Sequence, residues 1–398
     1  MSRRGPGDGS VRRRADGRWE GRVSEGYGPD GRRRVRSVYA ATRREAQERV
    51  RELLARRPLA RGAAEHATVG ELLDRYLAHD ARARLRPATV AGLESADRTW
   101  IRPHLGRRVL GRLQARDLEA WLANLRAAGA SPRTQLAAYQ TLSAACRWAV
   151  RRGELGASPL AGVARPRVER AERRTWTVDD ARRALAAVEG DRLEALLVLL
   201  LATGLRIGEA LALRWSEVDL EAGRLRVVRS ETEVGGELVE GGPKTAAGRR
   251  AVALAPSTVA ALRAHRARQV LEDAQLGDDA RARAQAEGRV FRGPRGGPLR
   301  ARTLRARWWL PLLERTGLPP ISFHELRHTS ATLLLEAGVH PRVVQERLGH
   351  SSVAITLDLY SHVAPHLQDA AAAALEYALG PSTALPLRPR REPRSGTE

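Results

Sequence analysis

The stretch Thr203-Gly-Leu-Arg-Ile-Gly-Glu-Ala210 closes the most apolar part of the chain, the run over residues 193–205. This run is interrupted by Glu194 and is too short to span a bilayer, so it predicts a buried helix. We expect helix over most of residues 193–213, with a break at Thr203 and Gly204. Arg206 and Glu209 are three residues apart, so the carboxylate can hold the guanidinium in place.

Three further blocks carry related chemistry: His324-Glu-Leu-Arg-His-Thr329, Leu348-Gly-His-Ser-Ser352 and Tyr360. Arginine binds phosphate through a planar fork, and two arginines on one phosphate stabilise charge on its nonbridging oxygens. A tyrosine supplies a phenolic nucleophile, which a neighbouring histidine can relieve of its proton. Together with Arg206, these blocks fit the breaking and rejoining of a DNA strand without metal or ATP.

Lysine usage points to a proton donor. The chain has 69 lysine and arginine residues, of which only Lys244 is lysine. A guanidinium stays protonated in proteins, whereas an ammonium can lose its proton. Lys244 is therefore our candidate for the group that protonates a departing oxygen.

The whole-chain composition favours a polyanionic partner. A net charge of +23 indicates nucleic acid first and an anionic membrane second. The single cysteine, Cys146, excludes an internal disulfide and a cysteine-rich zinc site, and we expect it to be a buried core residue. The basic N-terminus lacks an apolar signal core, so we expect a soluble, cytoplasmic, nucleoid-associated protein.

Residues 1–60 predict a small domain with a β-sheet and one helix. Residues 1–16 are rich in glycine and arginine and are expected to be disordered. Alternating stretches at 18–25 and 32–39 flank a glycine-containing turn and predict a hairpin. A helix should follow over 42–57, with Thr42 as its N-cap and Glu45 three residues on.

Residues 66–162 predict a domain of four helices. Thr68-Val-Gly-Glu71 is a capping box before the first, and others are expected over 87–101, 117–126 and from Ser131-Pro132 to about Arg151. Residues 163–174 lack apolar periodicity and predict a linker.

Residues 175–380 predict a larger α+β domain, with residues 381–398 as a flexible tail. Strands are expected at 224–229 and 249–254, joined by a glycine-rich loop that carries Lys244. Besides a helix that starts at Thr177, further helices are expected at about 257–275, 301–316, 324–337, 341–348, 352–360 and 365–379.

Each candidate residue also has an ordinary structural interpretation. Arg206 or Lys244 can be a solvated cation, and His350 a turn histidine. His324 can be a helix N-cap, His328 a surface residue and Tyr360 a core aromatic. Taken singly these interpretations are at least as good, but the combination, in this order along the chain, outweighs them.

The combination resembles the tyrosine recombinases, the phage-integrase family. The resemblance rests on the blocks quoted above together with Pro243-Lys-Thr245, and it covers residues 175–378 as the catalytic domain. Residues 66–162 resemble the family's helical core-binding domain, and the first sixty resemble its arm-binding domain. The chain departs from the pattern at Glu325, where many relatives have aspartate.

The resemblance implies a role for each residue. Tyr360 is the nucleophile that forms a 3′-phosphotyrosyl bond, and Arg206 and Arg327 clamp the scissile phosphate. Lys244 protonates the leaving oxygen from a β-hairpin, His324 assists proton transfer and His350 hydrogen-bonds the phosphate. No cofactor and no metal is implied. Glu209 supports Arg206, and the candidate DNA contacts outside the catalytic set are Arg133, Arg165 and Arg167.

The resemblance also implies the partners. These are double-stranded DNA attachment sites, a homotetramer formed on the DNA and, as a further candidate, an accessory bending or directionality factor; no membrane is expected. Two alternatives stay open: a non-catalytic DNA-binding protein and a type IB topoisomerase-like enzyme. Tyr377 is rejected as the nucleophile because it lacks an upstream Gly-His block. His362 and His366 are rejected as a zinc pair because no acidic or cysteine ligand accompanies them.

Overall fold

The computed structural model describes residues 10–27, 33–55, 66–169, 174–243, 246–350, 352 and 375–377. By its internal contacts the chain divides into two units, residues 1–171 and 172–398. The mixed, mainly helical fold class is confirmed. The finer domain boundaries, 1–60, 66–162, 163–174, 175–380 and 381–398, stay predictions.

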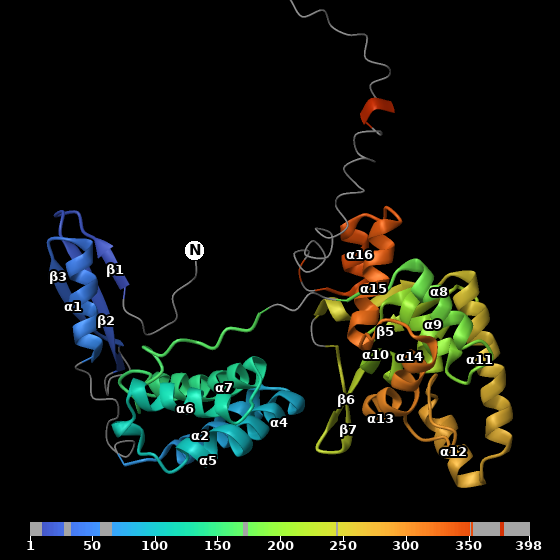
Figure 1. The fold of residues 1–398 in the computed structure, drawn as a ribbon, viewed down its shortest axis with the longest axis horizontal. Coiled ribbons are helices and arrows are strands. Elements are labelled where there is room, and N and C mark those ends of the chain that lie inside the picture. Colours follow the sequence, from blue (N-terminus) through green and yellow to red (C-terminus); the bar gives the residue numbers. More distant parts are fainter. Residues whose placement is uncertain are drawn as a thin grey trace, which may run out of the picture. The chain divides into compact units, whose positions relative to one another are not determined.

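The first unit begins with a three-stranded antiparallel sheet in the order β1-β2-β3. Helix α1 packs on one face of this sheet (Figure 1) and buries Val23, Ala46 and Val50. The elements are β1 Ser10–Arg13, β2 Trp19–Tyr27, β3 Arg33–Ala40 and α1 Arg43–Ala55.

The predicted hairpin and the predicted helix cap in this region are confirmed. Thr42 Oγ1 accepts a hydrogen bond from the Glu45 backbone N–H at 3.2 Å. The expectation of disorder over residues 1–16 is wrong for 10–13, because these residues pair with β2 in register from Ser10–Arg22 to Arg13–Trp19. Such pairing depends on a partner strand that local composition does not reveal. Residues 1–9 lie outside the described residues.

Over the described residues 66–169, the first unit forms four helices, as predicted. The first joins α2 Val69–Tyr76, a π-helical segment Leu77–Ala81 and α3 Arg82–Arg84, and the second joins α4 Pro87–Ala96, a π-helical segment Asp97–Ile101 and α5 Arg102–Leu105. A 3-10 turn, Leu110–Arg112, precedes α6 Ala115–Ala127 and α7 Pro132–Arg151.

Local sequence signals account for these helix starts, and apolar packing holds the helices together. The capping box of Thr68 and Glu71 is present, and Ser131 caps α7. Trp121, Leu72 and Cys146 lie in one apolar core, which confirms the buried cysteine. Burial of the thiol raises its pKa to about 12.

The second unit is built around α9, a helix buried on nearly all sides. Its neighbours include α8, α10, α11 and α15 (Figure 1). The helices are α8 Val178–Ala187, α9 Glu194–Thr203, α10 Ile207–Ala212, α11 Pro256–Ala274, α12 Asp278–Glu287, α13 Ala301–Leu304, α14 Leu310–Thr316, α15 Phe323–Glu336 and α16 Pro341–Leu348. A π-helical segment, Arg305–Trp309, joins α13 to α14.

Two small antiparallel sheets accompany these helices, one ordered β4-β5-β8 and one formed by β6 and β7. The strands are β4 Val218–Asp219, β5 Arg224–Val227, β6 Ser230–Val234, β7 Glu237–Gly241 and β8 Arg250–Ala253. Short 3-10 turns lie at Trp215–Glu217 and Ala246–Gly248.

Two expectations for this unit are corrected. Residues 230–241, expected as part of a glycine-rich loop, form the hairpin β6–β7, because Gly235 and Gly236 both adopt the positive φ that a tight two-residue turn requires. Helix α12 was not expected from its weak apolar pattern. The helices expected at 352–360 and 365–379 lie outside the described residues, apart from the helical residues 375–377 and from residue 352. In the part of the chain that is described, no helix has the length and hydropathy needed to cross a bilayer.

We predict that Gly21→Ala will destabilise the sheet and helix of the first unit by about 1–3 kcal/mol, the usual cost of overpacking. The added methyl would overlap Val50 Cγ2 and lie 3.2 Å from the Ala46 carbonyl oxygen. Hydrogen exchange of the β2 and α1 amides in the full chain measures this local loss. Gly92→Ala in α4 is the control, because its methyl would meet open space and should stabilise the helix by about 0.5–1 kcal/mol. Equal protection of β2 in both variants would contradict the packing argument.

Candidate active site

A glycine turn between α9 and α10 places Arg206. Gly204 ends α9 with a φ of +61°, and a Cβ there would overlap Leu348 Cδ2, so both its backbone angle and its surroundings require glycine. Two residues later Arg206 is the N-cap of α10, where its backbone N–H donates to the Glu209 carboxylate at 3.1 Å. The Arg206 side chain keeps 31% of its surface exposed, so it remains open to a ligand.

Glu209 joins two arginines at the base of the site. Its Oε1 accepts from Arg206 Nη1 at 2.7 Å, and its Oε2 accepts from Arg250 Nη2 at 3.0 Å. Burial opposes ionisation of this carboxyl, which is 1% exposed, but the charges of Arg250 and Arg206 outweigh it and lower the pKa of Glu209. The carboxylate is therefore ionised at neutral pH and fixes the orientation of both guanidinium groups.

Helix α15 supplies the second arginine of the site. The helix starts at Ser322, whose hydroxyl accepts from the Glu325 backbone N–H at 3.2 Å while the Glu325 carboxylate accepts from the Ser322 N–H at 2.7 Å. The N-cap is thus Ser322, not His324. Glutamate at position 325 completes this capping box, which gives the departure from the family pattern a structural role.

Arg327 is a buried cation held by neutral groups. Only 1% exposed, it donates from Nη1 to the Gly204 carbonyl at 2.7 Å and from Nη2 to the Leu348 carbonyl at 2.6 Å. Among the described residues it forms no ion pair with a carboxylate. Burial, followed by the neighbouring Arg206, lowers the pKa of Arg327 to about 9, which still leaves the cation at neutral pH. Such a group is stabilised by an incoming anion.

Three histidines lie in or beside this cluster. The rings of His324 and His328 meet edge to face with centroids 4.7 Å apart, His324 being exposed and His328 only 5% exposed. The interpretation of His328 as a surface residue is therefore wrong. His350 follows Gly349, which ends α16 with a φ of +67°, and is 5% exposed.

His350 is held as a neutral imidazole. Burial is the main cause, and the charges of Arg327, Arg206, His328 and Arg250 add to it, so that the pKa of His350 falls to about 3. A neutral ring beside two arginines can donate a hydrogen bond to a phosphate oxygen without adding a further charge.

The charge of the cluster is unbalanced. Among the described residues, the carboxylate of Glu209 alone offsets the cations Arg206, Arg250 and Arg327, which leaves a net positive charge in a largely buried setting. Such a cluster suits an anion with the planar pairs of oxygens that guanidinium forks match, as in a phosphodiester.

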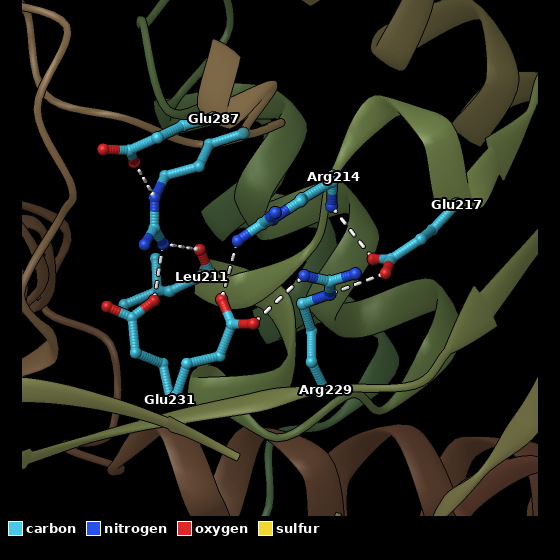
Figure 2. Close-up of polar contacts among 8 residues, drawn as sticks. Leu211, Arg214, Glu217, Arg229, Glu231 and Glu287 are labelled. Carbon is cyan, nitrogen blue, oxygen red and sulfur yellow. Dashed lines mark hydrogen bonds and ion pairs between the residues drawn. The ribbon is translucent and has the colours of Figure 1, made fainter. Parts of the chain in front are cut away.

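An ion-pair network fixes the hairpin β6–β7 to this unit (Figure 2). Arg289 Nη1 donates to Glu231 Oε2 at 2.5 Å and to the Leu211 carbonyl at 3.2 Å, and its Nε donates to Glu287 at 2.6 Å. A Cβ on Gly208 would overlap the Glu231 carbonyl oxygen, so α10 and β6 approach at backbone distance. The start of the hairpin therefore packs directly against α10, the helix that carries Glu209.

The other half of the network holds the second strand of the hairpin. Glu240, on β7, accepts from Arg214 and from Arg229, each at 3.0 Å, and Arg229 also donates to Glu217 at 2.6 Å (Figure 2). The network spans α10, the turn after it and both strands. It determines where the chain leaves β7, three residues before Lys244.

The structure brings together Arg206, Glu209, Arg327 and His350 of the predicted site, with His324 beside His328. Lys244 and Tyr360 lie outside the described residues, as do His362 and His366. Arg133, Arg165 and Arg167 belong to the first unit, and their role as DNA contacts stays a prediction.

Sequence reasoning missed Arg250 and His328. Arg250 is one of many arginines among the 69 basic residues, and what distinguishes it is its hydrogen bond to Glu209, 41 residues away. His328 lies four residues from His324 on α15, and that spacing was the available signal.

Comparison with known proteins gives a consistent result. The phage integrase family model matches residues 174–366. A tyrosine recombinase XerC-like protein from Caldanaerobacter subterraneus subsp. tengcongensis is 31% identical over 318 residues, which cover 76% of this chain and 81% of that protein.

Two solved structures share the fold. The Tn1549 transposon integrase in complex with transposon right end DNA has a TM-score of 0.63 at 23% identity, covering 79% of this chain and all of that one. The lambda integrase tetramer bound to a Holliday junction has a TM-score of 0.54 at 21% identity, covering 90% of this chain and 96% of that one.

We predict that the free energy of unfolding decreases as the pH is lowered below about 6.5, and that part of this decrease comes from His350. The folded-state pKa is about 3 against an ordinary 6.5, so below 6.5 the unfolded chain gains a proton that the folded chain does not. The loss is about 1.4 kcal/mol per pH unit, or about 2 kcal/mol at pH 5. Denaturant unfolding between pH 7.5 and 5 measures it, and His350→Gln should lose less over that interval. Parallel pH curves for the two proteins would refute a neutral, buried His350.

Proposed function

The chain belongs to the phage integrase family of tyrosine recombinases, and from that premise we propose that Arg206 and Arg327 clamp the scissile phosphate of a DNA attachment site. The protein is an enzyme, a site-specific recombinase that breaks and rejoins DNA strands. The observation that carries the proposed clamp is the buried Arg327, held by two carbonyls beside a second arginine.

The clamp acts as the phosphorus becomes five-coordinate. Negative charge then increases on the nonbridging oxygens, and guanidinium groups fixed in advance stabilise it without reorganisation. Glu209 fixes Arg206, and the carbonyls of Gly204 and Leu348 fix Arg327. His350, as a neutral donor, hydrogen-bonds one of the same oxygens.

Tyr360 is the proposed nucleophile. Its phenolic oxygen attacks phosphorus and forms the 3′-phosphotyrosyl bond while the bond from phosphorus to the 5′ oxygen breaks. His324 takes the phenolic proton, and the Lys244 ammonium gives a proton to the departing 5′ oxygen. The 5′-hydroxyl of the other strand then attacks the phosphotyrosine, which returns the tyrosine. Because one phosphate ester replaces another, this exchange needs no ATP.

The biological role that we propose is integration and excision of a mobile element. Its support is the small sheet-plus-helix module at the N-terminus. The sheet face away from α1 carries Arg12 and Arg22 around the buried Glu20, and Arg14 lies over the Tyr39 ring at 5.4 Å. This arginine-rich face and the net charge of +23 suit DNA.

Assembly and location are part of the same proposal. We place a homotetramer on two DNA duplexes, assisted by an accessory bending or directionality factor, in the cytoplasm at the nucleoid. The likeness in fold to an integrase tetramer on a Holliday junction supports the tetramer.

We predict that the wild type forms a covalent adduct with a nicked duplex carrying its attachment site, and that Tyr360→Phe forms none. Loss of the phenolic oxygen removes the nucleophile but leaves the phosphate-binding arginines, so DNA affinity should be nearly unchanged. A denaturing protein gel measures the adduct and a filter-binding assay measures affinity. Tyr377→Phe is the matched control and should form the adduct.

Other outcomes of this experiment separate the alternatives. Tight binding without any adduct would support a non-catalytic DNA-binding protein. Adduct formation and supercoil relaxation on any sequence would support a type IB topoisomerase-like enzyme.

We predict that Lys244→Ala slows adduct formation by roughly 10²–10⁴-fold, the usual contribution of a general acid. A substrate with sulfur at the 5′-bridging position should restore the rate, since a thiolate leaves without a proton. Single-turnover rates on both substrates measure the effect. Lys244→Arg is the matched control: it keeps the charge but cannot donate a proton readily, so it should be slow on oxygen and restored on sulfur. A failure of sulfur to restore either variant would remove Lys244 from the acid role.

A further inference from the structure

Arg250 uses its whole guanidinium inside the second unit. It opens strand β8, where it pairs with Val227 of β5, and its side chain is 6% exposed. Its Nε donates to the Arg347 carbonyl at 2.6 Å, its Nη1 to the Gly248 carbonyl at 3.0 Å and its Nη2 to Glu209 Oε2 at 3.0 Å. All three nitrogens are therefore engaged.

The three acceptors belong to three segments that converge only in the folded chain. Glu209 lies on α10, Gly248 ends the 3-10 turn before β8, and Arg347 lies in the last turn of α16. The backbone after α16 also lies against Arg250, since a Cβ on Gly349 would be 3.1 Å from Arg250 Cδ. This side chain thus connects the segment of Arg206 with the segment that leads to His350.

The charges show what Arg250 adds. Arg206, Glu209 and Arg250 together carry a net charge of +1, whereas Arg206 and Glu209 alone carry none. Without Arg250, the buried Glu209 carboxylate would have Arg206 as its only cationic partner among the described residues. The positive charge of Arg206 would then be offset by the negative charge of Glu209, which would weaken the attraction of Arg206 for a phosphate.

We propose that Arg250 is a positioning residue for the phosphate clamp: it binds one oxygen of the Glu209 carboxylate, leaves the group of Arg206, Glu209 and Arg250 with a net positive charge for the scissile phosphate, and holds the turn of His350 against α10. It acts through Glu209 and the α16 carbonyl and does not touch the DNA. This inference rests on the proposed role of Arg206.

The test compares two substrates with Arg250→Gln in the full-length chain. One nicked attachment duplex carries the natural scissile phosphate, and the other carries a methylphosphonate, in which a neutral methyl replaces one charged nonbridging oxygen. Arg250→Gln should slow adduct formation on phosphate by roughly 10²-fold, in the range for loss of a charge-stabilising donor. The ratio of the methylphosphonate rate to the phosphate rate should rise at least tenfold above that of the wild type. Arg206→Ala should raise the same ratio.

Arg292→Gln is the matched control. Arg292 has a side chain that is 5% exposed, and it donates to the Asp273 carboxylate and to the Gln269 carbonyl, both on α11. Its burial and its kinds of partner match those of Arg250, but they lie on a helix that carries no residue of the site. Its loss should lower the free energy of unfolding by a similar amount and leave the rate ratio at the wild-type value.

Arg250→Lys serves where the glutamine variant folds poorly. It keeps the charge and loses the three-way fork, so it should give a smaller rise in the ratio than Arg250→Gln. A ratio for both Arg250 variants equal to that of Arg292→Gln would show a purely structural arginine and overturn the inference. An absence of wild-type adduct on phosphate is a different result, which would overturn the proposed function and this inference with it.

Discussion

The site depends on one buried carboxylate placed between two arginines. Glu209 is 1% exposed and ionised, and it can be so because Arg206 and Arg250 each bind one of its oxygens. Burying an ionised carboxylate without a cationic partner would cost free energy, and without the carboxylate the two guanidinium groups would repel each other. The charge pattern thus fixes Arg206 in place before any substrate arrives, which is the preorganisation that transition-state stabilisation requires.

The positive charge left over in the cluster defines its chemistry. Arg327 is held by carbonyl oxygens, which orient a guanidinium without neutralising it. The neutral His350 adds a donor without adding a charge. In the proposed clamp, this arrangement binds the scissile phosphate as a diester and stabilises it further as negative charge builds on it.

Close backbone approach explains why glycines recur in the motifs. Gly204 leaves room for the Leu348 side chain, Gly208 for the Glu231 carbonyl, and Gly349 for the Ala247 carbonyl and the Arg250 side chain. Each of these contacts joins segments distant in sequence, so the glycines set the distances over which the arginines reach their partners. The ion pairs of Arg289 and Arg229 then hold the hairpin β6–β7 in place beside α10.

The sequence alone determined the features that depend on residues close together in the chain, such as helix starts and the motif blocks. Local signals at Thr68 and Thr177 predicted the starts of α2 and α8, and the apolar run over residues 193–205 predicted the buried α9. The motif blocks also indicated the family and singled out the two arginines of the proposed clamp. Tertiary structure alone decided that Arg250 is the second partner of Glu209, that β1 joins the first sheet and that His328 is buried. These depend on contacts between distant segments, and in a chain with 69 basic residues no local feature distinguishes Arg250, the distant arginine that binds Glu209 beside Arg206.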